Sequence, residues 1–326
     1  MIRSVLVGFI WLSCLGMFLS CGNGATTQKE GNGSVDGGPT SDATSVRPDE
    51  QTGPEKVPLP TQKVFGGERP VTLLLPKGYD PAESLPLVIV LHGLGVNGEF
   101  QAIYLQLPYL QEKKKFLLLA PDGTKFNDTL PFWNIGDKSL VDDVSYITSL
   151  IDEVSKVYRV DSKRVLLVGH SNGGFMSYRM ACDVTDKIAS IVSFAGTMYA
   201  PEDWPCKPTR KVNVLHIHST GDTVVKYKGG KTNAGGIVKE PVPYPGAVET
   251  VNWWVKHNQC KELKSTDETL DLEANVEGKE TTVQRAECPE GGAVELWTMD
   301  KAKHIPALTE AFAEKIWDWL VKHSKK

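Results

Sequence analysis

One short segment, residues 164–182, constrains the fold of this chain more than any other. Val165–Val168 is an apolar run, short enough to be a buried strand. From Phe175 onward the segment is rich in helix formers, with apolar side chains near helical spacing. Between them stands Gly169-His-Ser171-Asn-Gly173, so the order predicts a strand, a sharp turn at Ser171 and a helix.

Gly169 and Gly173, two residues before and two after Ser171, are required for steric reasons. A residue at a sharp strand-to-helix turn has a strained backbone, and the residues two before and two after it crowd each other. The Ser171 hydroxyl then projects above the sheet, beside the N–H of Asn172 at a helix N-terminus, where negative charge is favoured. The pattern G-x-S-x-G in this context indicates a nucleophilic serine. The alternative is a glycine-rich turn with an incidental serine.

Length and charge narrow the classes of protein to which the chain can belong. Its 326 residues suffice for one large or two small domains. With 40% hydrophobic and 23% charged residues, the composition is that of a globular protein. The formal net charge is −4 and the sequence has no basic stripe, so we expect no nucleic-acid partner.

Residues 1–20 have the pattern of an export signal. Arg3 supplies the positive start, and Val5–Leu19 is an apolar stretch of about 15 residues, which is short for a membrane-spanning helix. Cys21 is placed as in the lipobox of bacterial lipoproteins, a resemblance that implies a lipid anchor in a bacterial membrane. Cys14 is a second candidate, and an ordinary cleaved signal with a free Cys21 is the alternative. We therefore expect an extracellular or cell-surface protein.

The rest of the chain divides into a tether and one folded domain. Residues 21–60 are rich in small, polar and charged side chains and cannot offset the entropy cost of ordering, so they predict a disordered tether. Residues 61–326 alternate apolar runs with helical patterns, which predicts an α/β fold with a mostly parallel sheet covered on both faces. We expect strands at 71–75, 87–92, 116–120, 165–168, 188–194, 212–218, 283–287 and 294–299, and helices at 140–158, from 175 onward, at 247–258 and at 308–323.

Several stretches of the domain resemble the α/β-hydrolase superfamily. They are more similar to the secreted esterases grouped with polyhydroxybutyrate depolymerases and with feruloyl and acetyl-xylan esterases. The resemblance covers most of residues 61–326 and implies a serine esterase that needs no cofactor. It is carried by Leu91–Gly95, Val141–Val144, Arg164–Cys182, His216–Val225 and the region of His304.

In such enzymes the serine is followed in the chain by an acid and then a histidine. Asp222 follows an apolar strand and is the expected acid, although an aspartate in this position also suits a turn. His304, the last histidine before the final helix, is the expected general base. The alternative base, His323, lies at a helix end, where a cation is favoured for capping reasons alone.

The loop after the strongest strand should complete an oxyanion hole. The resemblance implies that backbone N–H groups of Gly93 and Leu94 join that of Asn172, although the same glycines would suit a tight turn. Trp133 stands in a polar loop and is a candidate for the substrate pocket, against the alternative that it packs in the core.

His216 and His218 form a His-x-His pair on one expected strand. Period-two spacing places both rings on one face, as in some metal sites. No third ligand has a clear spacing, so we favour a structural role and expect no metal.

Four cysteines remain in the expected domain. An even number in an exported chain indicates disulfides, and the count alone allows three pairings. Pairs in the similar esterases, and the nearness of the segments, imply Cys182–Cys206 and Cys260–Cys288. Reduced cysteines in the core are the alternative.

The sequence thus predicts a surface-anchored serine esterase that works through an acyl-enzyme. The resemblance implies feruloyl or acetyl esters of plant polysaccharide, or polyhydroxyalkanoate, as its ester substrate. The second hypothesis is a non-catalytic surface carbohydrate-binding lipoprotein on a hydrolase scaffold.

Overall fold

The computed structural model describes residues 63–136, 140–200 and 204–323, which all fall within one compact unit, Lys56–Lys326. The predicted signal (1–20), the lipidation candidate Cys21 and the tether (21–60) lie outside the described residues. No helix in the described ranges combines the length and the apolar character needed to cross a bilayer.

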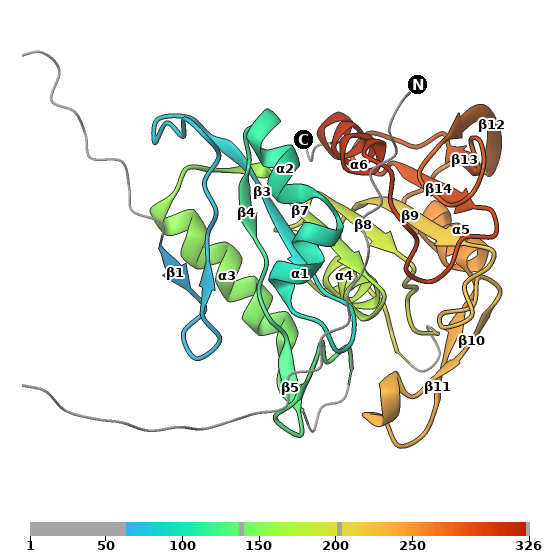
Figure 1. Ribbon diagram of the computed structural model, residues 1–326, viewed down its shortest axis with the longest axis horizontal. Coiled ribbons are helices and arrows are strands. Elements are labelled where there is room, and N and C mark those ends of the chain that lie inside the picture. The colour runs from blue at the N-terminus through green and yellow to red at the C-terminus, as the bar shows by residue number, and fades with distance from the viewer. Residues whose placement is uncertain (1–62, 137–139, 201–203, 324–326) are drawn as a thin grey trace, which may run out of the picture. The chain divides into compact units, whose positions relative to one another are not determined.

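An eight-stranded sheet runs through the unit in the order β12-β13-β14-β9-β8-β7-β3-β4 (Figure 1). All neighbours from β14 to β4 pair parallel, and β12 and β13 continue the sheet antiparallel at one edge. The mostly parallel sheet is therefore as predicted. The strands are β3 (Leu85–Leu91), β4 (Leu117–Leu119), β7 (Val160–His170), β8 (Ser190–Phe194), β9 (Asn213–Ser219), β12 (Leu263–Leu270), β13 (Thr281–Ala286) and β14 (Val294–Met299).

Helices cover both faces of the sheet, and each face has its own apolar core. Strand β3 shows why its sequence is a continuous apolar run: Leu87 and Ile89 pack on one face with α3, α4 and α5, while Val88 packs on the other with α2 and α6. The helices are α1 (Gly98–Tyr104), α2 (Leu107–Lys113), α3 (Asp143–Val157), α4 (Asn172–Asp183), α5 (Ala247–His257) and α6 (Ala311–Lys322).

Three small hairpin sheets lie outside the main sheet. One of them corrects the strand expected at 71–75: only Val71–Thr72 (β2) is a strand, and it pairs with β1 instead of the main sheet. The apolar pattern there reflects burial of Leu73 and a single bridge from Leu74 to Leu118. The hairpins are β1 (Val64–Phe65) with β2, β5 (Thr124–Phe126) with β6 (Leu130–Phe132), and β10 (Gly229–Thr232) with β11 (Val242–Pro245).

Both implied disulfides are present. Cys182–Cys206 joins the end of α4 to the segment before β9, and Cys260–Cys288 joins the segment after α5 to the end of β13. An oxidising compartment is where such bonds persist.

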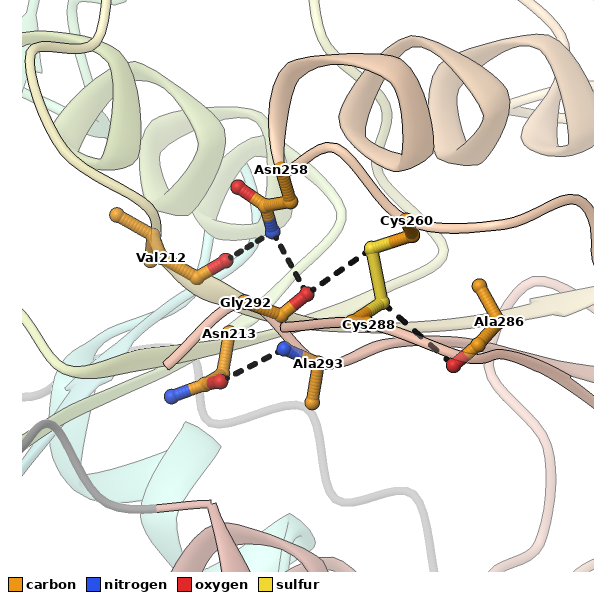
Figure 2. Close-up of a disulfide and its surroundings, with 8 residues drawn as sticks. All are labelled: Val212, Asn213, Asn258, Cys260, Ala286, Cys288, Gly292 and Ala293. Atoms are coloured by element: carbon orange, nitrogen blue, oxygen red, sulfur yellow. Dashed lines mark hydrogen bonds between the residues drawn. A yellow bond between two sulfur atoms is a disulfide. The ribbon is translucent and has the colours of Figure 1, made fainter. Parts of the chain in front are cut away.

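Figure 2 shows how the second disulfide shares its surroundings with Asn258, the C-cap of α5. The Asn258 amide donates to the carbonyl oxygens of Val212, at 2.8 Å, and Gly292, at 3.0 Å. The Sγ of Cys260 lies 3.3 Å from the same Gly292 oxygen. These contacts hold the end of α5 against the residues just before β9 and β14, at the end of β9 opposite to His218.

Removing the Cys260–Cys288 bridge should destabilise the unit without altering the loops at the other end of the sheet. The cysteines are separated by 28 positions. On the chain-entropy model, a cross-link closing a loop of this length stabilises the folded state by about 3–4 kcal/mol. We expect the double variant Cys260→Ser/Cys288→Ser to lose about that much free energy of unfolding in urea. Equal midpoints for the variant and the oxidised wild type would contradict this.

Candidate active site

The predicted site residues converge at the carboxyl ends of the parallel strands. Ser171 follows β7, Asp222 lies beyond β9 and His304 lies beyond β14. The Gly93–Leu94 loop follows β3. In open α/β sheets this edge is where ligands bind, so the topology alone brings segments distant in sequence to one place.

Ser171 has the strained backbone that its flanking glycines predict. Its φ is 55° and its ψ is −118°, and its N–H donates to the Phe194 carbonyl at 2.8 Å. A Cβ on Gly169 would stand 2.0 Å from the carbonyl oxygen of Gly173, and a Cβ on Gly173 would stand 2.0 Å from that of Leu91. The steric prediction for these two glycines is confirmed, because backbone atoms leave no room for a side chain.

A continuous line of hydrogen bonds joins the three polar residues. His304 Nε2 lies 2.9 Å from Ser171 Oγ, and His304 Nδ1 lies 2.7 Å from Asp222 Oδ2. The other carboxylate oxygen of Asp222 accepts from the N–H groups of Val224, at 2.8 Å, and Val225, at 2.9 Å. The acid is therefore held from both sides.

The surroundings of Asp222 favour its charged form. Burial alone would raise the pKa of this carboxyl, but hydrogen bonds from His218 and His304 outweigh it and hold the pKa below its ordinary value. The alternative base, His323, caps the end of α6 beside Glu295, where burial lowers its pKa to about 4. It makes no contact with Ser171 or Asp222.

The loop after β3 offers one free donor where two were expected. The Gly93 N–H donates to Gln101 Oε1 at 3.1 Å, so it is already engaged. Leu94 N–H takes part in no hydrogen bond found among the described residues, and Asn172, at the first position of α4, has no helical acceptor for its N–H. The geometry therefore favours Leu94 and Asn172 as the pair.

Gln101 is a site residue that the sequence reasoning missed. Its side chain is buried, and it borders the same cavity as Ser171. By accepting from Gly93 it fixes the loop and engages that N–H. It lies in α1, seven residues long, whose apolar pattern is too short to be recognised.

Trp133 is buried instead of standing in an open loop. Its indole Nε1–H donates to the His92 carbonyl at 3.1 Å, and its side chain packs in the core. Asn172 forms two hydrogen bonds with the Trp133 backbone: its amide oxygen accepts from the N–H at 2.6 Å, and its amide nitrogen donates to the carbonyl at 3.1 Å. Trp133 thus fixes the side chain of Asn172, and part of it also borders a cavity.

Two adjoining cavities open at this edge of the sheet. One, of about 270 Å³, contains Ser171 and His304. The other, of about 380 Å³, is predominantly apolar and includes Trp133 and Val238. Both cavities share four lining residues, namely Ile135, Asn172, Tyr199 and Ala234.

The His-x-His pair on β9 is linked internally. His216 Nε2 lies 3.1 Å from His218 Nδ1, and both rings are fully buried. Among the described residues no group of three His, Cys, Asp or Glu side chains is arranged to hold a metal ion.

His170, next to the serine, contacts the histidine loop. Its Nε2 lies 3.0 Å from the carbonyl oxygen of His304, which can only accept, so this nitrogen carries the proton. Burial, followed by the nearby His304, lowers the pKa of His170 to about 4. The ring is therefore neutral in the folded protein at pH 7.

The buried, neutral His170 should make stability fall in mild acid. The unfolded chain protonates this ring near pH 6.5, while the folded protein does so only near pH 4. Stability is therefore lost as pH falls through this window, by about 3 kcal/mol. His170→Gln keeps an amide donor without titrating, so its urea-unfolding free energy should drop less than that of wild type between pH 7 and pH 4. Equal losses would contradict the assignment.

Comparison with known proteins supports the fold and shows which esterases the chain is similar to. Residues 80–239 match the family model described as Phospholipase/Carboxylesterase. The chain is 29% identical over 164 residues to a bifunctional acetylxylan esterase/xylanase of Neocallimastix patriciarum, covering 50% of this chain and 23% of that one. It is 27% identical over 195 residues to feruloyl esterase B of Piromyces equi, covering 59% and 36%. The chain thus spans about a quarter to a third of the length of these two relatives.

A third relative and a solved structure match over more of their length. Feruloyl esterase D of Neurospora crassa is 22% identical, with 76% of this chain and 77% of that one covered. The acetyl xylan esterase from Aspergillus awamori superposes with a TM-score of 0.57 at 13% identity, covering 80% of this chain and 99% of that one, which shows the fold. The predicted α/β-hydrolase fold is confirmed, and residues 80–239, just under half of the chain, are similar to the phospholipase/carboxylesterase family.

Proposed function

We propose that the protein is a serine carboxylic-ester hydrolase that works through an acyl-enzyme. The observation that carries the proposal is the line from Ser171 Oγ through His304 to Asp222, with distances of 2.9 and 2.7 Å. A strained serine at a strand–helix turn and a histidine held by a buried carboxylate are the parts that nucleophilic catalysis requires.

The reaction proceeds in two halves. Ser171 Oγ attacks the ester carbonyl carbon while His304 Nε2 takes the hydroxyl proton, and the carbonyl oxygen becomes an oxyanion. Collapse of this intermediate breaks the bond to the alcohol oxygen, which receives the proton from His304. Water then attacks the acyl-enzyme by the same route and releases the acid. Asp222 holds the His304 tautomer and stabilises the imidazolium.

The oxyanion is stabilised by the N–H groups of Leu94 and Asn172. Each donor of this kind is worth about 3–4 kcal/mol in the transition state. Gly93, whose N–H donates to Gln101, supports the loop without being a donor to the substrate.

The larger cavity supports an acyl group bigger than acetyl. It adjoins the Ser171 cavity, shares Asn172 with it, and is lined mainly by apolar and aromatic side chains, Trp133 among them. Two of the relatives are named feruloyl esterases and one an acetylxylan esterase. A feruloyl ester of plant polysaccharide fits these observations better than an acetyl ester. Polyhydroxyalkanoate is the third candidate substrate, and the substrate panel below includes it.

The proposal includes export and lipid anchoring. It rests on the signal-like residues 1–20 with Cys21 behind them, and the two disulfides suit an oxidising compartment. A tethered domain on a cell surface would reach polymeric substrate that cannot enter the cell.

A fluorophosphonate probe tests the proposed chemistry. We expect wild type to be labelled on Ser171 and Ser171→Ala to remain unlabelled with an unchanged melting temperature. His304→Gln should label at least about 1,000-fold more slowly, because no base takes the hydroxyl proton. Folded wild type that resists the probe would favour the non-catalytic surface-binding alternative.

A substrate panel with a cavity variant tests the acyl group. Methyl ferulate should be hydrolysed with a higher kcat/KM than methyl acetate, acetylated xylan or hydroxybutyrate oligomers. Val238→Trp, which fills the larger cavity, should lower the ferulate-to-acetate ratio by about tenfold, equivalent to about 1.4 kcal/mol. The matched control Val248→Trp, at an exposed position on α5, should leave the ratio unchanged. A preference for acetate in wild type would overturn the feruloyl assignment.

A further inference from the structure

Three buried side chains that have no place in the proposed chemistry form a hydrogen-bonded chain behind Asp222. The Tyr178 hydroxyl oxygen lies 2.8 Å from His216 Nδ1, and His216 Nε2 lies 3.1 Å from His218 Nδ1. His218 Nε2 lies 2.7 Å from the Val225 carbonyl oxygen. Tyr178, His216 and His218 are at most 1% exposed, so bulk solvent does not reach this chain.

The partners at the two ends fix the direction of every hydrogen bond. The Val225 carbonyl can only accept, so His218 Nε2 carries a proton. His218 then accepts at Nδ1 from His216 Nε2–H, and His216 Nδ1 accepts from the Tyr178 hydroxyl. In the reverse direction the Tyr178 proton would need another acceptor, and none occurs among the hydrogen bonds of the described residues.

His218 meets Asp222 as well as Val225. Its Nε2 lies 3.4 Å from Asp222 Oδ2, the same oxygen that accepts from His304 Nδ1–H. The Val225 N–H in turn donates to Asp222 Oδ1. The ring therefore contacts both ends of the turn that carries the acid, while Tyr178 on α4 and His216 on β9 fix the ring itself.

The other polar groups around His218 are already engaged or neutral. The Tyr227 ring stands edge-on at 5.6 Å between centroids, and its hydroxyl pairs with Thr298. Burial lowers the pKa of His216 and raises the pKa of Tyr178, so both stay neutral at pH 7. Asp222 is the one charged group in contact with His218 in the described part of the chain.

We propose that His218 is a positioning residue for the catalytic acid: held in one tautomer and one orientation by His216 and Tyr178, it clamps the Asp222–Val225 turn and thereby sets Asp222 against His304. This role rests on the proposed esterase function. It assigns a use to the His-x-His pair other than metal binding, and it couples helix α4, which directly follows Ser171, to the acid loop.

Three variants separate positioning from bulk packing. His218→Phe keeps the ring but removes both nitrogens, His218→Gln restores an amide donor, and Tyr178→Phe removes only the hydroxyl that starts the chain. Asn258→Ala is the matched control, because it loses two buried hydrogen bonds at the other end of β9, about 20 Å away.

The measurements are kcat and KM on 4-nitrophenyl acetate, the pH profile of kcat/KM, and the downfield proton resonance of His304 Nδ1–H. We expect His218→Phe to lower kcat by about 10- to 100-fold with little change in KM, and to weaken the downfield resonance. In His218→Phe the acid limb of the kcat/KM profile should move to lower pH, because a displaced Asp222 carboxylate stabilises the His304 imidazolium less. Tyr178→Phe should show the same changes more weakly, and His218→Gln should recover most of kcat.

The outcomes distinguish this proposal from the proposed function. An inactive wild type would overturn the proposed esterase function. The downfield resonance depends only on the His304–Asp222 contact, so it would still test the role of His218. An unchanged resonance and pH profile in His218→Phe would overturn the positioning role. Equal loss of kcat in Asn258→Ala, at equal loss of melting temperature, would also overturn it, since general destabilisation would then explain both.

Discussion

The close approach of backbone segments around Ser171 is the constraint on which the site depends. At Gly169, Gly173 and Gly196 neighbouring backbone atoms leave no room for a Cβ, and a Cβ on Gly196 would stand 2.5 Å from the Ser171 carbonyl oxygen. A serine with φ of 55° costs about 1–3 kcal/mol. Burial of nearly all of α4 between the sheet and its neighbours holds that conformation in place, and the strain is what presents Oγ to His304.

The three polar residues stand on separate loops, and buried histidines contact these loops. His170 of the serine strand donates to the His304 carbonyl, and His218 contacts the turn that carries Asp222. Helix α4 supplies both Asn172, at the proposed oxyanion hole, and Tyr178, at the end of the chain behind the acid. A site braced in this way is ordered before substrate arrives, which is the condition for electrostatic stabilisation of a transition state.

Local sequence was enough to predict several features of the fold and of the candidate site. The apolar runs of β3 and β9 follow from burial on both faces, and the elbow follows from the need for glycine beside a strained serine. Gln101 could not be found, because its helix is too short to show a pattern and its role is to accept from a backbone N–H. The sequence left Trp133 open between the substrate pocket and the core, because its hydrogen-bond partner, the His92 carbonyl, lies 41 positions away. Ring orientations in the His-x-His pair depend on Tyr178, 38 positions away, which no local pattern reveals.

The most direct test of the account is a crystal structure of the protein after reaction with a small fluorophosphonate. The account predicts continuous density from Ser171 Oγ to phosphorus, with the phosphoryl oxygen within about 3.1 Å of the backbone nitrogens of Leu94 and Asn172. His304 should remain between Ser171 and Asp222. An adduct on another residue, or a phosphoryl oxygen directed away from both nitrogens, would contradict it.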